Sequence, residues 1–316
     1  MMADRGEIKI DGEVVIPKLA IMSDPGNEPE KVYEWVKFLQ SQVKNIKIVL
    51  TSNGNIIDDI LNGIDGNKRF ASVPFFTKRV VPVYEQILVG EEEIVLGDYD
   101  VLKEDYDQDG KHIEDDSDIF ITYKDGKKIA VAKKLKYKQG LQLGFKTEKG
   151  ILWRQCTGEY KINGVRKELR KQFGYGPREK IKHKFRLWMG ISTDEIQRVK
   201  PSGVGYIENT FPLIDYEMSR EDCLQWFREN ELPLPPRSSC IICPYHSNTH
   251  WKDMKENDPI SWFMAVEFDK KIRNMPRIDS EAFLHRSCVP LDQADLGADQ
   301  LGFDLFDNEC EGMCGV

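Results

Sequence analysis

The sequence contains no uninterrupted apolar stretch close to the roughly 18 residues that a membrane-spanning helix needs. Its first residues also lack the apolar segment of a secretion signal, because Asp4, Arg5 and Glu7 stand there. Internal repeats and low-complexity tracts are absent as well. Since 40% of the residues are apolar and 31% are charged, we expect a globular protein of the cytoplasm rather than an exported, membrane-bound or disordered one.

Cysteine is scarce and its number is odd, with 7 among 316 residues. A secreted disulfide framework usually has an even number of cysteines in a short chain, so this pattern argues against one. We therefore expect the cysteines to serve as thiols, metal ligands or redox groups in a reducing compartment.

The formal net charge of −8 is spread unevenly along the chain. Between Glu85 and Asp118 there are 14 acidic and 2 basic residues, a local charge of −12. Between Lys161 and Arg186 there are ten basic and two acidic residues, a local charge of +8. Part of this basic segment is expected to be a solvated helix face. So many like charges also predict a phosphate-bearing ligand, either a nucleotide or the backbone of DNA or RNA.

The first part of the chain has the pattern of an α/β protein. Residues 19–22 and 47–51 are short apolar runs typical of buried strands, and between them Val32, Val36 and Leu39 recur at helical spacing from about Glu28 onward. A strand, a helix and a second strand at this spacing predict a parallel pair. Ligands bind at the carboxyl ends of such strands, where residues 23–24 and 51–54 would lie.

The whole chain divides into four segments that differ in composition and charge. We expect a first part of the α/β domain at 1–78, an acidic β-rich insertion at 79–150, a second part at 151–250, and a helical, cysteine-rich extension at 251–316, irregular from about Phe283. Within the insertion, residues 119–131 predict a hairpin closed by an Asp-Gly turn. Further along, Ser192 with Glu195 and Ser219 with Asp222 predict capped helix starts, and residues 211–215 predict a strand.

The cysteines form three groups that could carry chemistry. Cys240 and Cys243 are separated by two residues, a spacing that can place both sulfurs on one metal ion or iron–sulfur cluster. Cys156 lies 84 residues upstream of Cys240, and the third group comprises Cys288, Cys310 and Cys314 near the end of the chain. Cys223 fits a small buried hydrophobic residue. We expect at least three of the other six to share a metal site or a redox function.

The acidic segment contains a partial match to a calcium-binding loop, formed by Asp105, Asp107, Asp109 and Asp116. The match is imperfect because His112 stands where such a loop has an aliphatic residue and because strands rather than helices flank it. An acidic hairpin tip is the expected alternative.

Four segments follow one another in order between residues 16 and 250, interrupted by 79–150. They are Ser23-Asp24-Pro25-Gly26-Asn27-Glu28-Pro29, Cys156 with Lys161, residues 188–198 with Gly190 and Arg198, and residues 211–216. Together they resemble the phosphoadenosine phosphosulfate (PAPS) reductase-like family of the adenine-nucleotide α-hydrolase superfamily, which shares a fold with the PP-loop ATP pyrophosphatases. This resemblance implies a PP-loop-like parallel sheet, whose phosphate-binding loop would lie upstream of Met1.

The resemblance also implies site roles and cofactors. Near an adenine nucleotide, ATP or a PAPS-like molecule, it places Ser23, Asp24 (also as a catalytic residue), Gly26, Gly190 and Arg198. At phosphates or sulfate it places Arg154, Lys161 and Arg166. It implies a 4Fe–4S cluster on Cys156, Cys240 and Cys243, with zinc as the alternative metal. The fourth ligand would be Cys288, Cys310 or Cys314, or one iron would stay open. Cys310 or Cys314 would also serve as nucleophile, with a thiol electron donor as partner.

We therefore expect a PAPS-reductase-like enzyme that binds an adenine nucleotide and transfers or reduces sulfur with an iron–sulfur cluster. The alternatives are an ATP-dependent nucleic-acid modification enzyme, such as a thiolation enzyme, and a non-catalytic nucleotide- or nucleic-acid-binding subunit. Binding to RNA or DNA that weakens steeply with salt would favour the first alternative. A missing phosphate loop would favour the second.

Overall fold

A computed structural model describes the chain except for residues 11, 65–72, 99–118, 125–126, 277 and 298–316. It is a mixed α/β structure with two compact units. The first unit contains Met1–Arg79 and Lys149–Val316, and the second contains Val80–Glu148.

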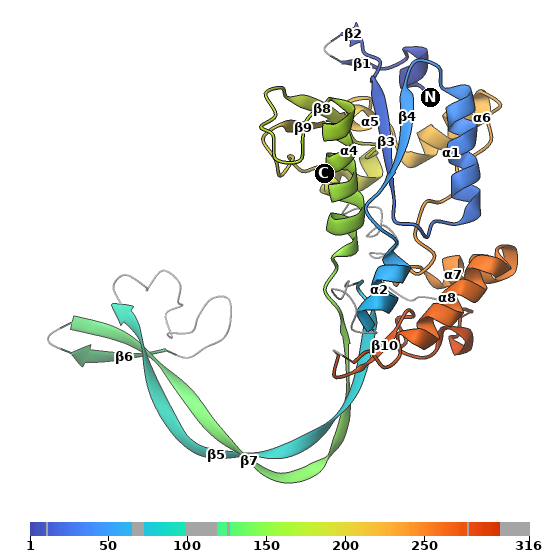
Figure 1. Ribbon diagram of the computed structural model, residues 1–316. Coiled ribbons are helices and arrows are strands. Elements are labelled where there is room, and N and C mark those ends of the chain that lie inside the picture. Colours follow the sequence, from blue (N-terminus) through green and yellow to red (C-terminus); the bar gives the residue numbers. More distant parts are fainter. Residues whose placement is uncertain (11, 65–72, 99–118, 125–126, 277, 298–316) are drawn as a thin grey trace. The chain divides into compact units, whose positions relative to one another are not determined.

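The first unit contains a parallel strand pair near its N-terminus (Figure 1). Strand β3 (Leu19–Asp24) pairs with β4 (Lys47–Ser52), with Leu19 opposite Lys47 and Asp24 opposite Ser52. Helix α1 (Glu30–Gln42) connects them, so the predicted strand–helix–strand unit is confirmed. The helix begins two residues later than predicted because Pro29 occupies its N-cap with an extended backbone, and Val32 and Val36 are its buried residues.

A second parallel pair joins β8 (Phe185–Trp188) to β9 (Ile207–Thr210). The predicted strand at 211–215 is wrong, because the chain turns there into the short helix α5 (Pro212–Asp215). Pro212 lacks the N–H that a strand ladder needs, and its fixed φ suits the first turn of a helix. The strand therefore ends at Thr210.

Strands β3 and β8 border one cavity of about 500 Å³. Its lining includes the consecutive residues 19–21 of β3 and 185–188 of β8, and most of the lining side chains are apolar. Among the described strands, β3 pairs only with β4, and β8 pairs only with β9. The second edge of each strand thus borders this cavity without a strand beside it.

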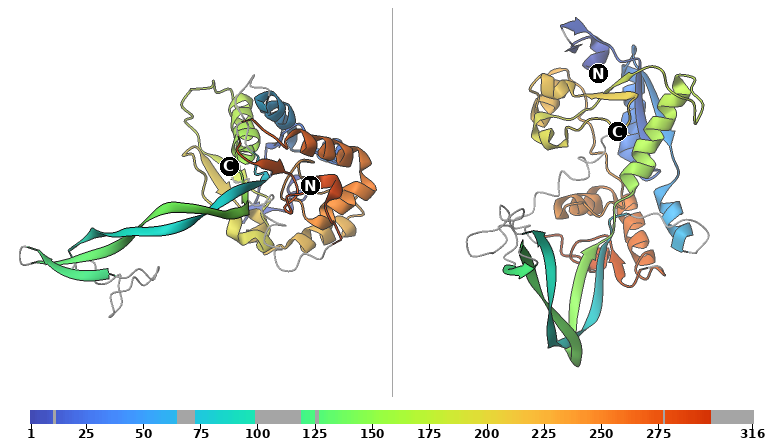
Figure 2. Two further views of the ribbon diagram at one scale, coloured as in Figure 1. Left: turned by 90° about the horizontal axis from the view of Figure 1, so that it is seen from below. Right: turned by 90° about the vertical axis from the view of Figure 1, so that its left-hand side faces the viewer.

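Several helices and short strands complete the first unit (Figure 2). They are η1 (Ala3–Arg5), β1 (Lys9–Ile10), β2 (Glu13–Val14), α2 (Ile56–Ile64), η3 (Thr157–Ile162), α4 (Asn163–Gln172), η4 (Thr193–Arg198), α6 (Arg220–Glu229), α7 (Asn248–Asn257), α8 (Pro259–Lys271), β10 (Glu281–Phe283) and η5 (Leu291–Gln293). The capping box of Ser219 and Asp222 at the start of α6 is confirmed. The helix start predicted at Ser192 is confirmed, because η4 begins at Thr193 with Ser192 as its N-cap residue. Its capping box is wrong, because the Ser192 hydroxyl donates to Asp194 and Glu195 pairs with Arg198 instead.

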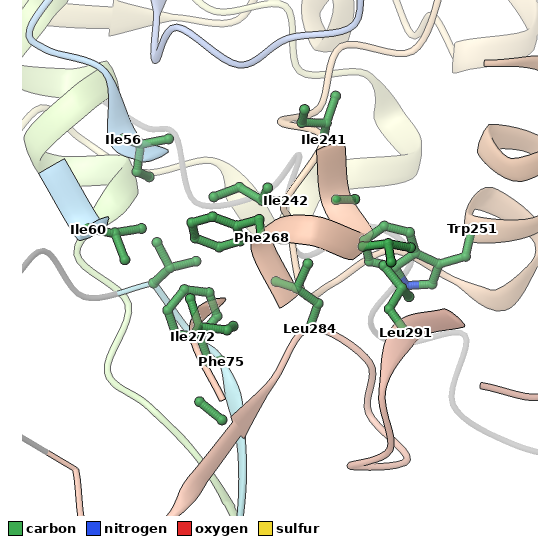
Figure 3. Packing of buried hydrophobic residues seen from close by; sticks show 14 of the residues in the cluster. Ile56, Ile60, Phe75, Ile241, Ile242, Trp251, Phe268, Ile272, Leu284 and Leu291 are labelled. Carbon is green, nitrogen blue, oxygen red and sulfur yellow. The ribbon is translucent and has the colours of Figure 1, made fainter. Parts of the chain in front are cut away.

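The main core of the first unit gathers apolar side chains from α2, the 241–242 turn, α7, α8 and β10 (Figure 3). Trp251, Phe268 and Ile272 come from the helical C-terminal part, while Ile241 and Ile242 come from the segment between the two cysteines of the Cys-x-x-Cys pair. Burying the two isoleucines contributes about 1.5–3 kcal/mol each to the free energy of unfolding. The turn that presents Cys240 and Cys243 is therefore anchored in the core.

The second unit is built from long antiparallel strands. β5 (Phe76–Asp98) lies beside β7 (Lys127–Ile151), and β7 pairs with β6 (Ile119–Lys124). The register places Ile119 opposite Ala132 and Lys124 opposite Lys127, so the predicted hairpin is confirmed. The start of β5, within the first unit, pairs with β10. The partial calcium loop at 105–116 lies outside the described residues.

Candidate functional site

A tight turn follows the carboxyl end of β3. The Asp24 carboxylate accepts hydrogen bonds from the Gly26 amide at 2.7 Å and from the Tyr33 hydroxyl at 3.0 Å. Gly26 has a φ of 84°, and a Cβ at this position would lie 2.8 Å from Nδ2 of Asn55. Burial, reinforced by the nearby Asp24 charge, raises the pKa of Tyr33 to about 12, so its hydroxyl remains a donor at neutral pH. The turn is thus held from both sides and requires glycine.

The turn after β3 is joined directly to the Cys-x-x-Cys segment. The Ile241 amide donates to the carbonyl oxygen of Asn27 at 2.9 Å, and the Ser238 hydroxyl donates to the Glu28 carboxylate at 3.1 Å. Asn27 and Glu28 are both 6% exposed. These buried contacts place the two cysteines at the carboxyl end of β3.

Cys156 stands at the start of the helix that runs through η3 into α4. The first turns, Thr157–Ile162, are wound as a π-helix, a form that is rare and frequent at functional sites. The Tyr160 carbonyl accepts a hydrogen bond from the Ser23 hydroxyl at 2.6 Å, and the Tyr160 hydroxyl donates to Asp59 at 2.9 Å. The helix start is therefore fixed against the ends of β3 and α2.

These segments enclose a cavity of about 30 Å³ at the carboxyl end of β3. Three thiols line it, those of Cys156, Cys240 and Cys243. The other lining residues are Pro25, Ile56, Val73, Pro74, Arg154, Thr157, Lys161, Ile242, Pro244 and Tyr245. The Arg154 guanidinium lies 5.3 Å from the centre of the Tyr245 ring. The cavity thus combines three sulfur atoms with two cations.

Thr157 gives this cavity a polar group without a partner. Its side chain is 8% exposed, and its Oγ1 makes no hydrogen bond within the described chain. Ser239, which is 3% exposed and precedes Cys240, has an unpaired Oγ as well. A buried hydroxyl without a partner costs about 1–3 kcal/mol, so such groups call for a ligand or water.

The electrostatics of the cavity favour a protonated Cys240 thiol when no metal is bound. Burial raises the pKa of Cys240, the Glu28 carboxylate raises it further, and the Lys161 ammonium opposes the shift. Next to it, Nε2 of the buried His246 lies 3.0 Å from the Cys240 carbonyl oxygen, so the neutral ring donates this proton. Burial lowers the pKa of His246, which keeps the ring neutral.

The donor set of the cavity suits a sulfur-ligated metal. Thiolates bind zinc and iron–sulfur clusters, and Arg154 and Lys161 would offset their negative charge. Within the described part of the chain, no three His, Cys, Asp or Glu side chains are close enough together to hold a metal ion as placed. The cavity has room for one ion or water molecule, so a larger cluster requires its walls to separate.

Other residues implied by the resemblance lie outside the thiol-lined cavity. Gly190 is exposed after β8, and Arg198 forms a 2.5 Å ion pair with Glu195. Arg166 on α4 has a buried Nε without a hydrogen bond. The Cys288 thiol contacts the carbonyl oxygens of Thr77 and Arg286 instead, at 3.7 Å each. Cys310 and Cys314 lie outside the described residues.

The sequence interpretation missed several residues of this site. Thr157, Tyr245 and Pro244 line the cavity, and Glu28 and His246 hold the segment around Cys240. For all of them except Glu28, a position next to Cys156 or within a few residues of Cys243 was the available signal.

No protein-family model matches the chain, and no curated protein or solved structure matches it either. In the described part of the chain, every helix is too short or too polar to cross a membrane.

Proposed function

We propose that the chain has a PP-loop-like fold and is a PAPS-reductase-like enzyme. It binds an adenine nucleotide at the carboxyl end of β3 and transfers or reduces sulfur with an iron–sulfur cluster carried by Cys156, Cys240 and Cys243. The observation that supports this proposal is the shared cavity: thiols from segments 84 residues apart line one space beside the turn after β3. In α/β proteins, ligands bind at this end of the strands.

The proposal assigns a role to each group around the cavity. Bound at the three thiolates, a cluster would supply electrons or an open iron site for sulfur. Arg154 and Lys161 hold the negative phosphate or sulfate of the nucleotide, and the Thr157 hydroxyl donates a hydrogen bond to an anionic oxygen. The turn at Asp24 and Gly26 positions the nucleotide against the thiols.

We propose that the C-terminal cysteines act at this cavity. The last described residues are held beside the start of α7, where Nδ2 of Asn248 donates to the carbonyl oxygen of Asp295 at 3.2 Å. Cys310 follows Gly297 by 13 residues, which span up to roughly 40 Å when extended. In the proposed enzyme, Cys310 or Cys314 supplies the nucleophile or the fourth cluster ligand.

The test is the metal and sulfide content of protein purified without oxygen, together with its visible spectrum. We expect about four irons with matching sulfide per chain, and loss of both in Cys156→Ala and in Cys240→Ala. Cys223→Ala is the matched control, because Cys223 is half-buried and lies outside the cavity. One zinc without iron, or no metal in wild-type protein, would overturn the proposal.

A further inference from the structure

The basic segment forms a second cavity, outside the thiol-lined one. Its volume is about 500 Å³, and it lies between the end of α4, the chain leading into β8 and the residues before β9. The lining residues are Arg170, Glu179, Lys180, Ile181, Lys182, His183, Lys184, Gly205 and Tyr206. We call it the basic groove.

Glu179, the acidic residue in the lining of the groove, is hydrogen-bonded to a backbone amide. The Arg170 guanidinium donates to the carbonyl oxygens of Gly176 and Glu179, and the Glu179 carboxylate accepts from the Gly176 amide at 3.0 Å. Glu179 is the only acidic residue in 174–186, against five Lys and Arg residues. Its carboxylate is thus engaged in closing the turn rather than in neutralising the lysines.

Two lysines of the groove remain available for a ligand. Lys184 lies 3.4 Å from the Glu208 carboxylate, whereas within the described chain Lys180 and Lys182 form no ion pair. Both are exposed. Tyr206, also in the lining, is half-buried and packs against the core around Leu169 and Ile207, which leaves part of its ring for a base to stack on.

Further cations lie on the chain between the thiol-lined cavity and the groove. Lys161 lines that cavity, Lys167 is exposed on α4, and Arg170 reaches the groove. The ten residues of α4 span about 15 Å. The phosphates of one mononucleotide cover only part of this distance, whereas a strand repeats its phosphates along it.

The basic groove lies in one of two strongly positive stretches of the chain. Residues 161–186 carry +8 and residues 124–149 carry +7, although the whole chain carries −8, and such stretches attract a polyanion. We propose that the basic groove binds the phosphate backbone of a single-stranded nucleic acid, with a base stacked on Tyr206. An open groove of about 500 Å³ with one tyrosine in its lining favours a flexible strand over a flat anionic membrane. This inference goes beyond the proposed function and does not depend on it.

The experiment measures fluorescence anisotropy of labelled single-stranded RNA and DNA oligonucleotides of about 20 residues, titrated with the full chain over a range of salt concentrations. The variant is Lys180→Glu with Lys182→Glu. Its matched control is Lys252→Glu with Lys271→Glu, which makes the same charge change at exposed lysines on α7 and α8. Circular dichroism verifies that both variants fold, and Lys180→Ala with Lys182→Ala serves as a milder second variant.

We expect the groove variant to weaken binding at least about tenfold, while the control changes it less than about twofold. The slope of log affinity against log salt should also become shallower by about 1.4 in the Ala variant, because two phosphate contacts are lost. Absence of binding at about 50 mM salt, equal losses in both Glu variants, or equal affinity for phosphatidylserine vesicles would overturn the inference. Cys156→Ala should bind like wild type, so a failed cluster test leaves this result interpretable.

Discussion

The amide of Ile241 donates a hydrogen bond to the carbonyl oxygen of Asn27 at 2.9 Å, although the two residues are far apart in the sequence. Asn27 follows the turn after β3, and Ile241 lies between the two cysteines of the Cys-x-x-Cys pair. Because Ile241 is also buried in the main core, this contact couples the core, the thiols and the turn. Changes in any of these three are therefore expected to affect the others.

Gly26→Ala should destabilise the protein more than the same change at Gly12. Both glycines have nearly the same φ, 84° and 83°, but a Cβ at Gly26 meets Asn55 whereas one at Gly12 has nothing within 4 Å. We expect Gly12→Ala to cost about 1 kcal/mol for the left-handed backbone alone, and Gly26→Ala at least about 2 kcal/mol. Urea unfolding measures both, and equal costs would contradict the tight turn described above.

Gly164→Ala should also be destabilising, although alanine normally strengthens a helix. A Cβ at Gly164 would lie 2.1 Å from the Ser23 hydroxyl oxygen, so we expect a cost of about 1–3 kcal/mol. Gly158→Ala is the control in the preceding helical turn, where a Cβ meets nothing and should gain up to about 1 kcal/mol. In a Ser23→Ala background most of the Gly164→Ala cost should disappear, and a cost that persists there would place its origin elsewhere.

The Thr157 hydroxyl should matter for ligand binding rather than for folding. Because its Oγ1 is buried without a partner, Thr157→Val removes an unsatisfied group at nearly constant volume. The free energy of unfolding of the ligand-free protein should stay equal or rise by up to about 1 kcal/mol, while affinity for an adenine nucleotide falls. Thermal unfolding and calorimetric titration measure the two quantities. A large loss of stability would show that the hydroxyl is satisfied in the folded protein.

Stability should decrease in mild acid because of His285. Burial, with the nearby Arg286 charge, lowers the pKa of His285 from 6.5 to about 4, while Nε2 lies 2.9 Å from the Asn248 side-chain oxygen. Between these two pH values the unfolded chain binds a proton that the folded chain does not. The His285 contribution is therefore complete above about pH 6.5 and falls by roughly 3 kcal/mol on reaching pH 4.

Comparing wild type with His285→Gln isolates this contribution from other buried groups. Unfolding in urea between pH 7 and pH 4 should give a shallower pH dependence for the variant, by about 1.4 kcal/mol per pH unit at most. Parallel curves for the two proteins would mean that His285 is protonated in the folded state.

The sequence predicted local structure where one physical signal dominated. Apolar runs at 19–22 and 47–51 around a helical repeat predicted the parallel pair, and two strand-like runs around Asp125-Gly126 predicted the hairpin. The prediction failed at 211–215 because apolar residues were read as a strand although Pro212 cannot donate to a ladder. At Ser192 a capping pattern was present, but Arg198 offered Glu195 a better partner than the backbone.

For the candidate site, the sequence and the resemblance selected Cys156, Cys240 and Cys243, which the structure brings to one cavity. Whether these thiols hold a metal stays a prediction. The unpaired hydroxyl of Thr157 and the contact of Glu28 with Ser238 arise from tertiary packing, and no periodicity or spacing in the sequence encodes them. The position of Cys288 outside the cavity likewise depends on how the chain folds, which the presence of a cysteine at this position does not predict.

The cavity between β3 and β8 should affect the exchange of backbone amide hydrogens with solvent along β3. Successive amides of a strand point to opposite sides, so along Leu19–Asp24 every second N–H faces β4 and the intervening ones face the edge without a strand. Amides on the β4 side exchange only when the pair opens, whereas those on the other side have no strand partner in the described chain and should exchange faster. Deuterium uptake should therefore alternate from residue to residue along β3, a pattern absent from strands paired on both edges.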